Sequence, residues 1–327
     1  MVDVIADIGG THARFALWDS GRDIAISNRL QAVQTFLTRD FASLAEAAKA
    51  YCDGQHITPE RLCLAVAGPV EADRIIMSNN DWSFSKTALK KSLLLDRLCV
   101  VNDFTAQALL PPMLGKDEKQ LIKSGQPMDA TPYAILGPGT GLGVCALLPV
   151  SGNDHQDISW RPLESEGGNS LFAPRDSQEA DLREFIAEKT GRIVTFEEVL
   201  SGRGLEIIYR FCTADKKSLS AAEITENAPH DPIAEQAVLL FLNCLSNFVL
   251  NVILMTGARQ GVYLSGGILP RLSSFFDKSA FMHRLSHYGI FSDYLANVPV
   301  WLITAAHPGL LGAGLALSNQ HLRHRQI

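Results

Sequence analysis

Several features that would assign the chain to other classes of protein are absent. No uninterrupted apolar run approaches the ~18 residues that a membrane-spanning helix needs. The first residues lead directly into a β-branched run, without the basic segment and apolar core of a signal peptide. We therefore expect a cytoplasmic protein that has no membrane partner.

Cysteine is scarce, and none of it is arranged for metal binding. The chain has six cysteines, and no two have the spacing typical of zinc ligands. Cys63 and Cys99 lie inside apolar runs, which is typical of buried thiols in a reducing compartment. We therefore expect no disulfide framework.

An excess of positive charge is also missing. The chain has 29 Lys and Arg against 35 Asp and Glu, which gives a formal net charge of -6. A mildly acidic chain lacks the electrostatic footprint of a nucleic-acid-binding protein, so no nucleic-acid partner is expected. The short basic segment from His321 to Arg325 is more typical of a solvated helix end than of a binding arm.

Two common nucleotide-binding motifs do not occur. The chain has no P-loop of the Gly-x-x-x-x-Gly-Lys-Ser/Thr type, and no early Gly-x-Gly-x-x-Gly between a strand and a helix. A dinucleotide-binding fold is therefore disfavoured. The late run from Gly309 to Gly314 follows Pro308 and predicts close helix packing.

The chain does contain two similar strand pairs, each built around glycine. Residues 4–8 and 14–18 flank Gly9-Gly10, and residues 133–136 and 144–148 flank the turn 137–143. Each pattern predicts a β-hairpin. With 327 residues, more than one core is expected, and the repeated design predicts two similar α/β lobes. Chance similarity of two glycine turns is the alternative.

The remaining pattern alternates strands and helices. The segment 231–255 is apolar nearly all round and predicts a helix buried in a core. Further strands are expected at 62–67, 97–101, 262–265 and 300–303, and further helices at 40–52 (capped by Asp40), 85–95, 104–110, 178–190, 197–211 and 308–317.

Three strand ends carry glycine clusters that suit a phosphate. They are Gly9-Gly10-Thr11, Gly139-Thr140-Gly141 and Gly266-Gly267. Glycine lets main-chain N–H groups approach an anion closely, and the hydroxyls of Thr11 and Thr140 add donors. Asp7 precedes the first cluster, and its carboxylate suits Mg²⁺ because hard cations take oxygen ligands.

These segments resemble the motifs of bacterial glucokinases, within the hexokinase and actin-like sugar kinase clan and in the group without a zinc motif. The matches run in order along the chain: Asp7–Arg14, Asn102–Ala106, Gly137–Gly143, Ser165–Gly168, Phe172–Pro174, Val199–Leu205, Leu264–Pro270 and Pro308–Gly312. The resemblance implies a two-lobed actin-like (ribonuclease H-like) ATPase fold, with mixed sheets flanked by helices. It also implies a small domain of residues 1–110 plus 300–327, a large domain of residues 111–299, and often a homodimer.

The resemblance also implies roles for particular residues. Asp103 would be the general base that takes the proton from the attacking sugar hydroxyl; an N-cap of the following helix is the alternative for this residue. The sugar would contact Asn102, Asp103, Gly141, Glu166, Asn169 and Glu197. ATP would contact Asp7, Gly9, Gly10, Thr11, Gly139, Thr140, Gly266 and Gly267, and Asp7 would act on Mg²⁺ through water. Without the motif, an exposed surface carboxylate would be the simpler interpretation of Glu166 and Glu197.

One position departs from the family pattern. The family usually has a sugar-contacting histidine where this chain has Asn169. Asparagine donates and accepts hydrogen bonds but is shorter and cannot become cationic. Phosphorylation of glucose by ATP, a glycolytic reaction, is the leading interpretation. The alternative is a kinase for a different hexose or a weakly active sugar-binding regulator.

Two other classes share the fold that the resemblance implies. A non-enzymatic sugar sensor needs an output module, and no helix-turn-helix precedes the first strand of this sequence. An actin-like or chaperone-type ATPase would hydrolyse ATP without sugar, and the segment around Glu166 counts against it.

Overall fold

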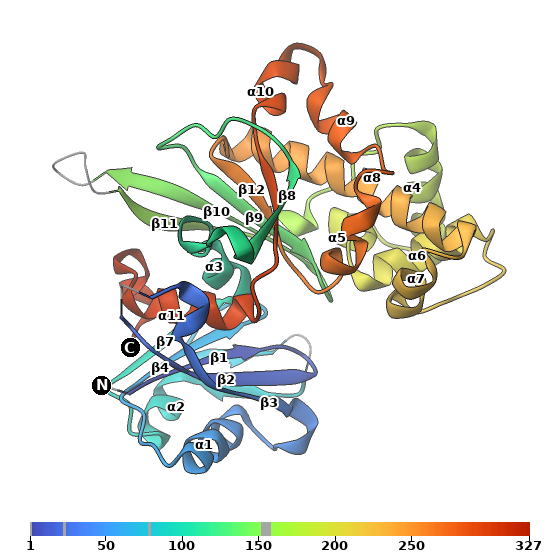
Figure 1. The fold of residues 1–327 in the computed structure, drawn as a ribbon. Coiled ribbons are helices and arrows are strands. Elements are labelled where there is room, and N and C mark those ends of the chain that lie inside the picture. Colours follow the sequence, from blue (N-terminus) through green and yellow to red (C-terminus); the bar gives the residue numbers. More distant parts are fainter. Residues whose placement is uncertain (1, 22–23, 78–79, 152–157) are drawn as a thin grey trace. The chain divides into compact units, whose positions relative to one another are not determined.

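The computed structural model describes residues 2–21, 24–77, 80–151 and 158–327, and the chain divides into two compact units (Figure 1). Unit 1 comprises Met1–Glu118, Val150–Leu163 and Ala305–Ile327. Unit 2 comprises Lys119–Pro149 and Glu164–Thr304. Each unit is built on its own mixed sheet.

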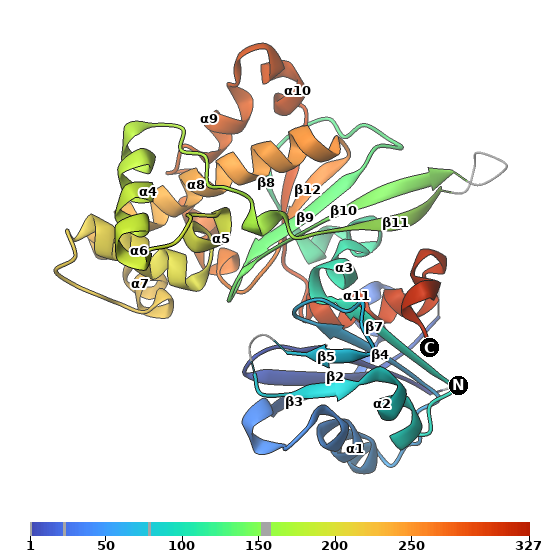
Figure 2. The same ribbon diagram turned by 180° about the vertical axis from the view of Figure 1, so that it is seen from behind.

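Unit 1 contains a five-stranded sheet in the order β3-β2-β1-β4-β7. β1 and β2 form the predicted antiparallel hairpin, while β1, β4 and β7 run parallel to one another. Helices α1 and α2 cover one face of this sheet and α11 covers the other (Figures 1 and 2). The main elements of unit 1 are β1 (Asp3–Ile8), β2 (His12–Trp18), β3 (Leu30–Leu37), α1 (Leu44–Gln55), β4 (Arg61–Val66), β5 (Arg74–Ile76), β6 (Ser83–Ser85), α2 (Lys86–Ser92), β7 (Arg97–Asn102), α3 (Asp103–Ala108) and α11 (Pro308–Ser318).

Unit 2 contains most of a six-stranded sheet in the order β11-β10-β9-β12-β13-β8. β9 and β10 form the second predicted hairpin, in which Leu136 pairs with Val144. The strands of this sheet are β8 (Lys119–Lys123), β9 (Tyr133–Pro138), β10 (Leu142–Ser151), β11 (Ile158–Ser165), β12 (Gly261–Leu264) and β13 (Val300–Ile303), of which most of β11 and the end of β10 are counted with unit 1. The helices of unit 2 are α4 (Ser177–Thr190), α5 (Phe196–Val199), α6 (Gly202–Cys212), α7 (Ala221–Asn227), α8 (Pro232–Thr256), α9 (Phe281–Ser286) and α10 (Ser292–Ala296).

Helix α8 is the centre of the unit 2 core. Asp231 caps it, Pro232 occupies its first turn, and Gly257 ends it in a left-handed conformation. By length and composition it could cross a membrane, but most of it is buried against β9, α5, α6, α7 and α9. This burial confirms the prediction of a core helix and accounts for its apolar character.

Two details of the predicted helices are wrong. The segment 197–211 is two helices, because the chain leaves helical geometry at Leu200 and Ser201 caps a new helix, α6. The helix expected from Asp40 starts at Leu44, because Ser43 is its cap and accepts the N–H of Glu46. Both differences come from local capping, which periodicity does not report.

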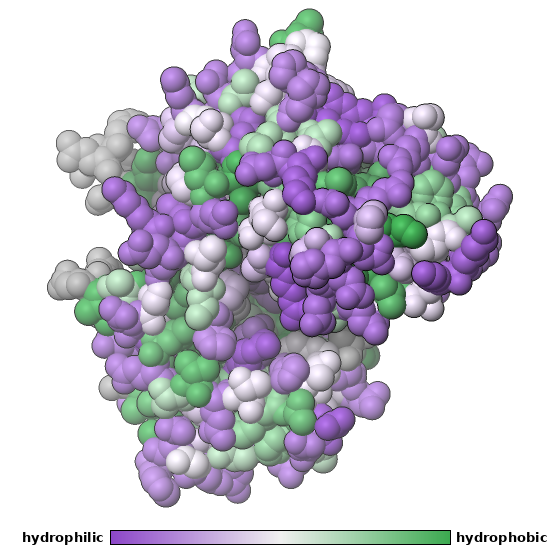
Figure 3. Space-filling model, turned by 45° about the vertical axis from the view of Figure 1, so that its right-hand side comes forward, coloured by the Kyte–Doolittle hydropathy of each residue, from purple (hydrophilic) through white to green (hydrophobic). Residues whose placement is uncertain are grey.

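Apolar and polar side chains are interspersed on the face of the molecule in Figure 3. The most exposed large apolar side chains, Ile290 and Leu94, are 94% and 80% exposed and belong to different units. Exposed apolar residues scattered in this way are ordinary for a protein surface.

Candidate active site

The strand register of unit 1 gathers the predicted residues at one edge of the sheet. Ile8 at the end of β1 pairs with Val66 of β4, and Val66 pairs with Asn102 at the end of β7. The three strands are parallel, so their carboxyl ends meet at this edge. The glycine turn after β1 and the start of α3 at Asp103 therefore lie two strands apart.

The first glycine turn is stabilised by hydrogen bonds within the hairpin and from Thr38 and Asn80 outside it. The N–H of Gly9 donates to the carbonyl of His12 (2.9 Å), and Asn80 Nδ2 donates to the carbonyl of Gly9 (3.1 Å). Thr38 Oγ1 donates to the carbonyl of Gly10 (2.8 Å), and the Thr38 N–H to that of Thr11 (3.0 Å). Asn80 and Thr38 were not predicted, because no sequence signal links them to a turn so far away along the chain.

Asp7 points its carboxylate at Arg14 and at the start of α11. Arg14 Nη1 lies 3.3 Å from Asp7 Oδ2. A β-carbon on Gly309 would lie 2.5 Å from Asp7 Cγ, so only glycine leaves room for this carboxylate. The pKa of Asp7 is raised above its ordinary value, because the effect of burial exceeds the lowering effect of Arg14 and of the nearby His307.

At the end of β7, Asn102 rather than Asp103 is the N-cap of the following helix. Asn102 is the N-cap of α3, and its Oδ1 accepts the N–H groups of Phe104 (2.9 Å) and Thr105 (3.2 Å). Asp103 is the first residue of the helix, and its Oδ1 accepts the Phe104 N–H (3.0 Å). Asn102 is therefore the cap, so capping alone does not account for an aspartate at position 103.

In unit 2 the second and third glycine clusters pack on each other. A β-carbon on Gly137 would lie 2.0 Å from the carbonyl oxygen of Ser265, and one on Gly266 would lie 2.4 Å from that of Pro138. Gly266 also has a φ of +98°, which L-residues rarely adopt. Gly267 has open space beside it, and Thr140 is exposed at the tip of the turn.

The predicted sugar segment lies against the same turn. A β-carbon on Gly168 would lie 2.0 Å from the carbonyl oxygen of Leu142, and Glu197 Oε2 accepts the Leu142 N–H (2.9 Å). Glu166 and Asn169 are exposed and belong to one tight turn, in which the Asn169 N–H donates to the Glu166 carbonyl (3.0 Å).

The structure thus brings together two sets of predicted residues, one in each unit. Unit 1 holds Asp7, Gly9, Gly10, Thr11, Asn102 and Asp103, and unit 2 holds Gly139, Thr140, Gly141, Glu166, Asn169, Glu197, Gly266 and Gly267. Among the residues that the structure describes, no group of three or more His, Cys, Asp or Glu could hold a metal ion. A Mg²⁺ ion at Asp7 would therefore depend on water and substrate oxygens, which suits the preference of this ion for retaining several waters.

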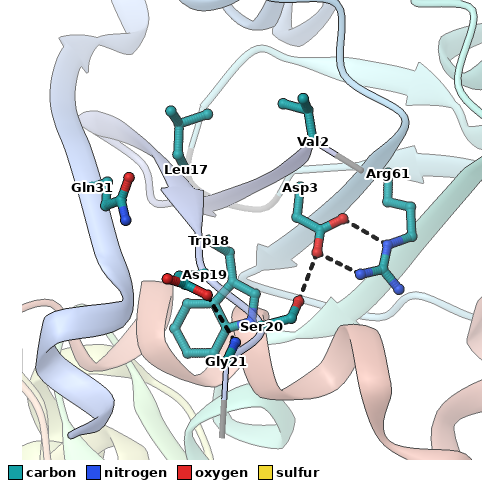
Figure 4. Close-up of a pocket in the computed structure, with 9 residues that line it drawn as sticks. All are labelled: Val2, Asp3, Leu17, Trp18, Asp19, Ser20, Gly21, Gln31 and Arg61. Carbon is teal, nitrogen blue, oxygen red and sulfur yellow. Dashed lines mark hydrogen bonds and ion pairs between the residues drawn. The ribbon is translucent and has the colours of Figure 1, made fainter. Parts of the chain in front are cut away.

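A separate hollow of about 480 Å³ lies in unit 1 beside the start of β1, at the opposite end of that strand from Gly9 (Figure 4). Its lining includes Trp18, Ser20 and the ion pair between Asp3 and Arg61. Arg61 Nε donates to Asp3 Oδ1 (2.6 Å) and Ser20 Oγ to Asp3 Oδ2 (2.9 Å), so both carboxylate oxygens are engaged within the protein. None of the predicted site residues lines this hollow.

Comparison with solved structures identifies the class of protein. A crystal structure of a glucokinase from an Antarctic psychrotroph superposes with a TM-score of 0.83. The two chains are 34% identical, and the match covers 98% of this chain and 99% of that chain. The fold is therefore that of an actin-like sugar kinase, as the sequence predicted.

The glucokinase family model matches residues 4–320, and the chain belongs to this family. A glucokinase of Neisseria meningitidis serogroup C (serotype 2a) is 36% identical over an alignment of 328 positions, which covers 98% of this chain and 96% of that protein. The "Bifunctional protein glk" of Paraburkholderia xenovorans is 38% identical over an alignment of 324 positions, which covers 97% of this chain and 49% of that protein. The chain thus spans about half the length of the bifunctional relatives that it matches. The resemblance stated from the sequence is confirmed.

Proposed function

We propose that the chain is an ATP-dependent hexose kinase that converts glucose and ATP into glucose 6-phosphate and ADP. The observation that carries this proposal is the position of Asp103, which follows β7 at the same sheet edge as the glycine turn after β1. Incubation with ATP, Mg²⁺ and glucose, followed by NMR of the product, tests it. A phosphate on the 6-hydroxyl supports the proposal, and unchanged glucose contradicts it.

In the proposed mechanism, Asp103 is the general base. Its ionised carboxylate accepts the proton of the attacking sugar hydroxyl while the oxygen of that hydroxyl forms a bond to the γ-phosphorus and ADP leaves. Asn102, Glu166, Asn169, Glu197 and the backbone of Gly141 hold the sugar hydroxyls. Carboxylates suit this task because they accept hydrogen bonds from neighbouring hydroxyls.

The glycine clusters are proposed to hold the nucleotide. Main-chain N–H groups of Gly9, Gly10, Thr11, Gly139 and Thr140 would face the phosphates, and Gly266 and Gly267 the adenosine. Asp7 would orient Mg²⁺ through water, and the ion would neutralise charge on the phosphate oxygens.

Gly309→Ala tests the placement of Asp7. The new methyl group would meet the Asp7 carboxylate at 2.5 Å and displace it, so we expect kcat/KM for ATP·Mg²⁺ to fall about tenfold or more. The matched control is Gly54→Ala in α1, where the new carbon would meet no atom within 4 Å beyond its chain neighbours and the backbone of its own helix. Steady-state kinetics at varied Mg²⁺ measure both variants, and equal kinetics in the two would contradict the role given to Asp7.

The residue at position 169 favours a second candidate, a kinase for a hexose other than glucose. Asn169 is exposed in the predicted sugar segment and is shorter than the histidine of the family pattern. We expect Asn169→His to shift kcat/KM toward glucose, relative to other hexoses, by about 3–10-fold. This factor corresponds to the free energy that one hydrogen bond contributes. A hexose panel measured for both proteins tests this, and an unchanged preference would contradict a role for position 169 in specificity.

We propose a cytoplasmic homodimer in glycolysis, with neither a nucleic acid nor a membrane as partner. The formal net charge of -6 supports the absence of a nucleic-acid partner. Analytical ultracentrifugation of the purified chain tests the dimer.

A further inference from the structure

The Glu197 side chain lies against the second glycine turn. It lies in the first turn of α5, and its Oε2 accepts the N–H of Leu142 at the exit of the second glycine turn (2.9 Å). A β-carbon on Gly141 would lie 2.5 Å from the same oxygen and 3.1 Å from the carboxyl carbon. The carboxylate therefore lies directly on the backbone of the turn that is proposed to hold phosphate.

The backbone at this point depends on a side chain for its hydrogen bond. Leu142 is the first residue of β10 and lies opposite Pro138 of β9, and the acceptor of its N–H is the Glu197 carboxylate. Glu197 satisfies the Leu142 N–H from outside the hairpin, while Gly168 packs on the Leu142 carbonyl. The Leu142 backbone is thus fixed by Glu197 and by the predicted sugar segment.

Backbone hydrogen bonds join α5 to the predicted sugar segment and the neighbouring helix α6 to the glycine turn. The Phe196 N–H donates to the carbonyl of Ser170 (2.9 Å), directly after the turn that contains Glu166 and Asn169. The Gly202 N–H donates to the carbonyl of Gly139 (2.9 Å), so the start of α6 also holds the glycine turn. A shift of α5 on sugar binding would therefore move the glycine turn as well.

The second oxygen of Glu197 is available to a ligand. In the part of the chain that the structure describes, Oε1 makes no hydrogen bond to protein, and the residue is only half-buried. We infer that Glu197 couples sugar binding to nucleotide binding, with Oε1 accepting a sugar hydroxyl while Oε2 holds the Leu142 N–H. This inference rests on the proposed function and adds a positioning role to the predicted sugar contact.

The coupling is measured by calorimetry with ADP·Mg²⁺ as the nucleotide probe, with and without saturating glucose. For the wild type we expect glucose to tighten ADP binding by about 5–50-fold, and ADP to tighten glucose binding by the same factor. We expect Glu197→Ala to reduce this factor to about one and to weaken sugar-free ADP binding about 3–10-fold, because the Leu142 N–H loses its acceptor.

Glu197→Gln separates the two functions of the side chain. Its amide oxygen still accepts the Leu142 N–H, so sugar-free ADP affinity should stay within about twofold of the wild type, while glucose affinity falls about tenfold. Glu198→Ala is the matched control, since this neighbour pairs with Arg192 (3.6 Å) and should leave all these affinities unchanged.

The outcomes separate the inference from the proposed function. A wild-type coupling factor of one, or a Glu197→Ala variant that keeps both the wild-type factor and its sugar-free ADP affinity, overturns the inference. Loss of coupling in Glu197→Ala, with sugar-free ADP binding retained in Glu197→Gln, supports it. If these binding results hold but the wild type forms no sugar phosphate, only the proposed function fails.

Discussion

Asp103→Asn is expected to lower kcat for hexose phosphorylation by about 10²–10⁴-fold, with the KM values for sugar and ATP changed only a fewfold. Asparagine cannot accept the proton of the sugar hydroxyl, but it has nearly the same shape as aspartate. Its amide oxygen can still accept the Phe104 N–H, and Asn102 remains the cap of α3, so the local fold should persist. Steady-state kinetics at saturating ATP and sugar measure the effect.

The control for this variant is Asp53→Asn, the same substitution at an exposed position of α1. It should leave kcat within about twofold of the wild type, because surface substitutions away from special features have small effects. If Asp103→Asn turned over at a near-normal rate, Asp103 would not be the base.

Glu179→Ala is expected to destabilise unit 2 by about 3–5 kcal/mol, because it removes the buried carboxylate of an ion pair and leaves the charge of Arg284 only partly compensated. Glu179 in α4 is fully buried and accepts hydrogen bonds from Arg284 of α9, from Asn247 Nδ2 of α8 (2.7 Å) and from the Arg175 N–H (2.6 Å). Arg284 also contacts Asp176, the N-cap of α4 (2.5 Å). This network joins three helices of one unit, so its loss should lower the stability of the whole unit.

Differential scanning calorimetry measures this change. For a unit of this size we expect Tm to fall by roughly 6–20 °C. Glu184→Ala on the same helix is the control: its ion pair with Arg183 (3.2 Å) is largely exposed, so its loss should cost no more than about 0.5 kcal/mol. Equal stability of the two variants would show that the buried network contributes little.

The sequence predicted those parts of the fold whose signals are local. The hairpins around Gly9 and Gly139 follow from apolar runs on both sides of glycine, and α8 follows from its cap and its apolar composition. β3 and β8 were not predicted. β3 is an edge strand with a largely exposed pattern, and β8 has only five residues, so neither carries a strong hydrophobic signal.

The candidate site was likewise predicted only where its residues are neighbours in the sequence. The sequence located the glycine turns and Asp103 through motifs whose residues are neighbours in the chain. It could not show that Asn80 holds the carbonyl of Gly9 or that Gly309 makes room for Asp7, because those contacts join residues far apart in sequence. The family resemblance implied only a sugar contact for Glu197, since nothing in the local sequence pattern indicates that its carboxylate accepts the Leu142 N–H.

The most direct test of the proposed kinase activity is the release of ADP from ATP·Mg²⁺ with and without a hexose. We expect ADP release that depends on hexose, with one sugar phosphate formed for each ADP and almost none formed by Asp103→Asn. ADP release that is equally fast without sugar, or absent with every hexose tried, would contradict a hexose kinase.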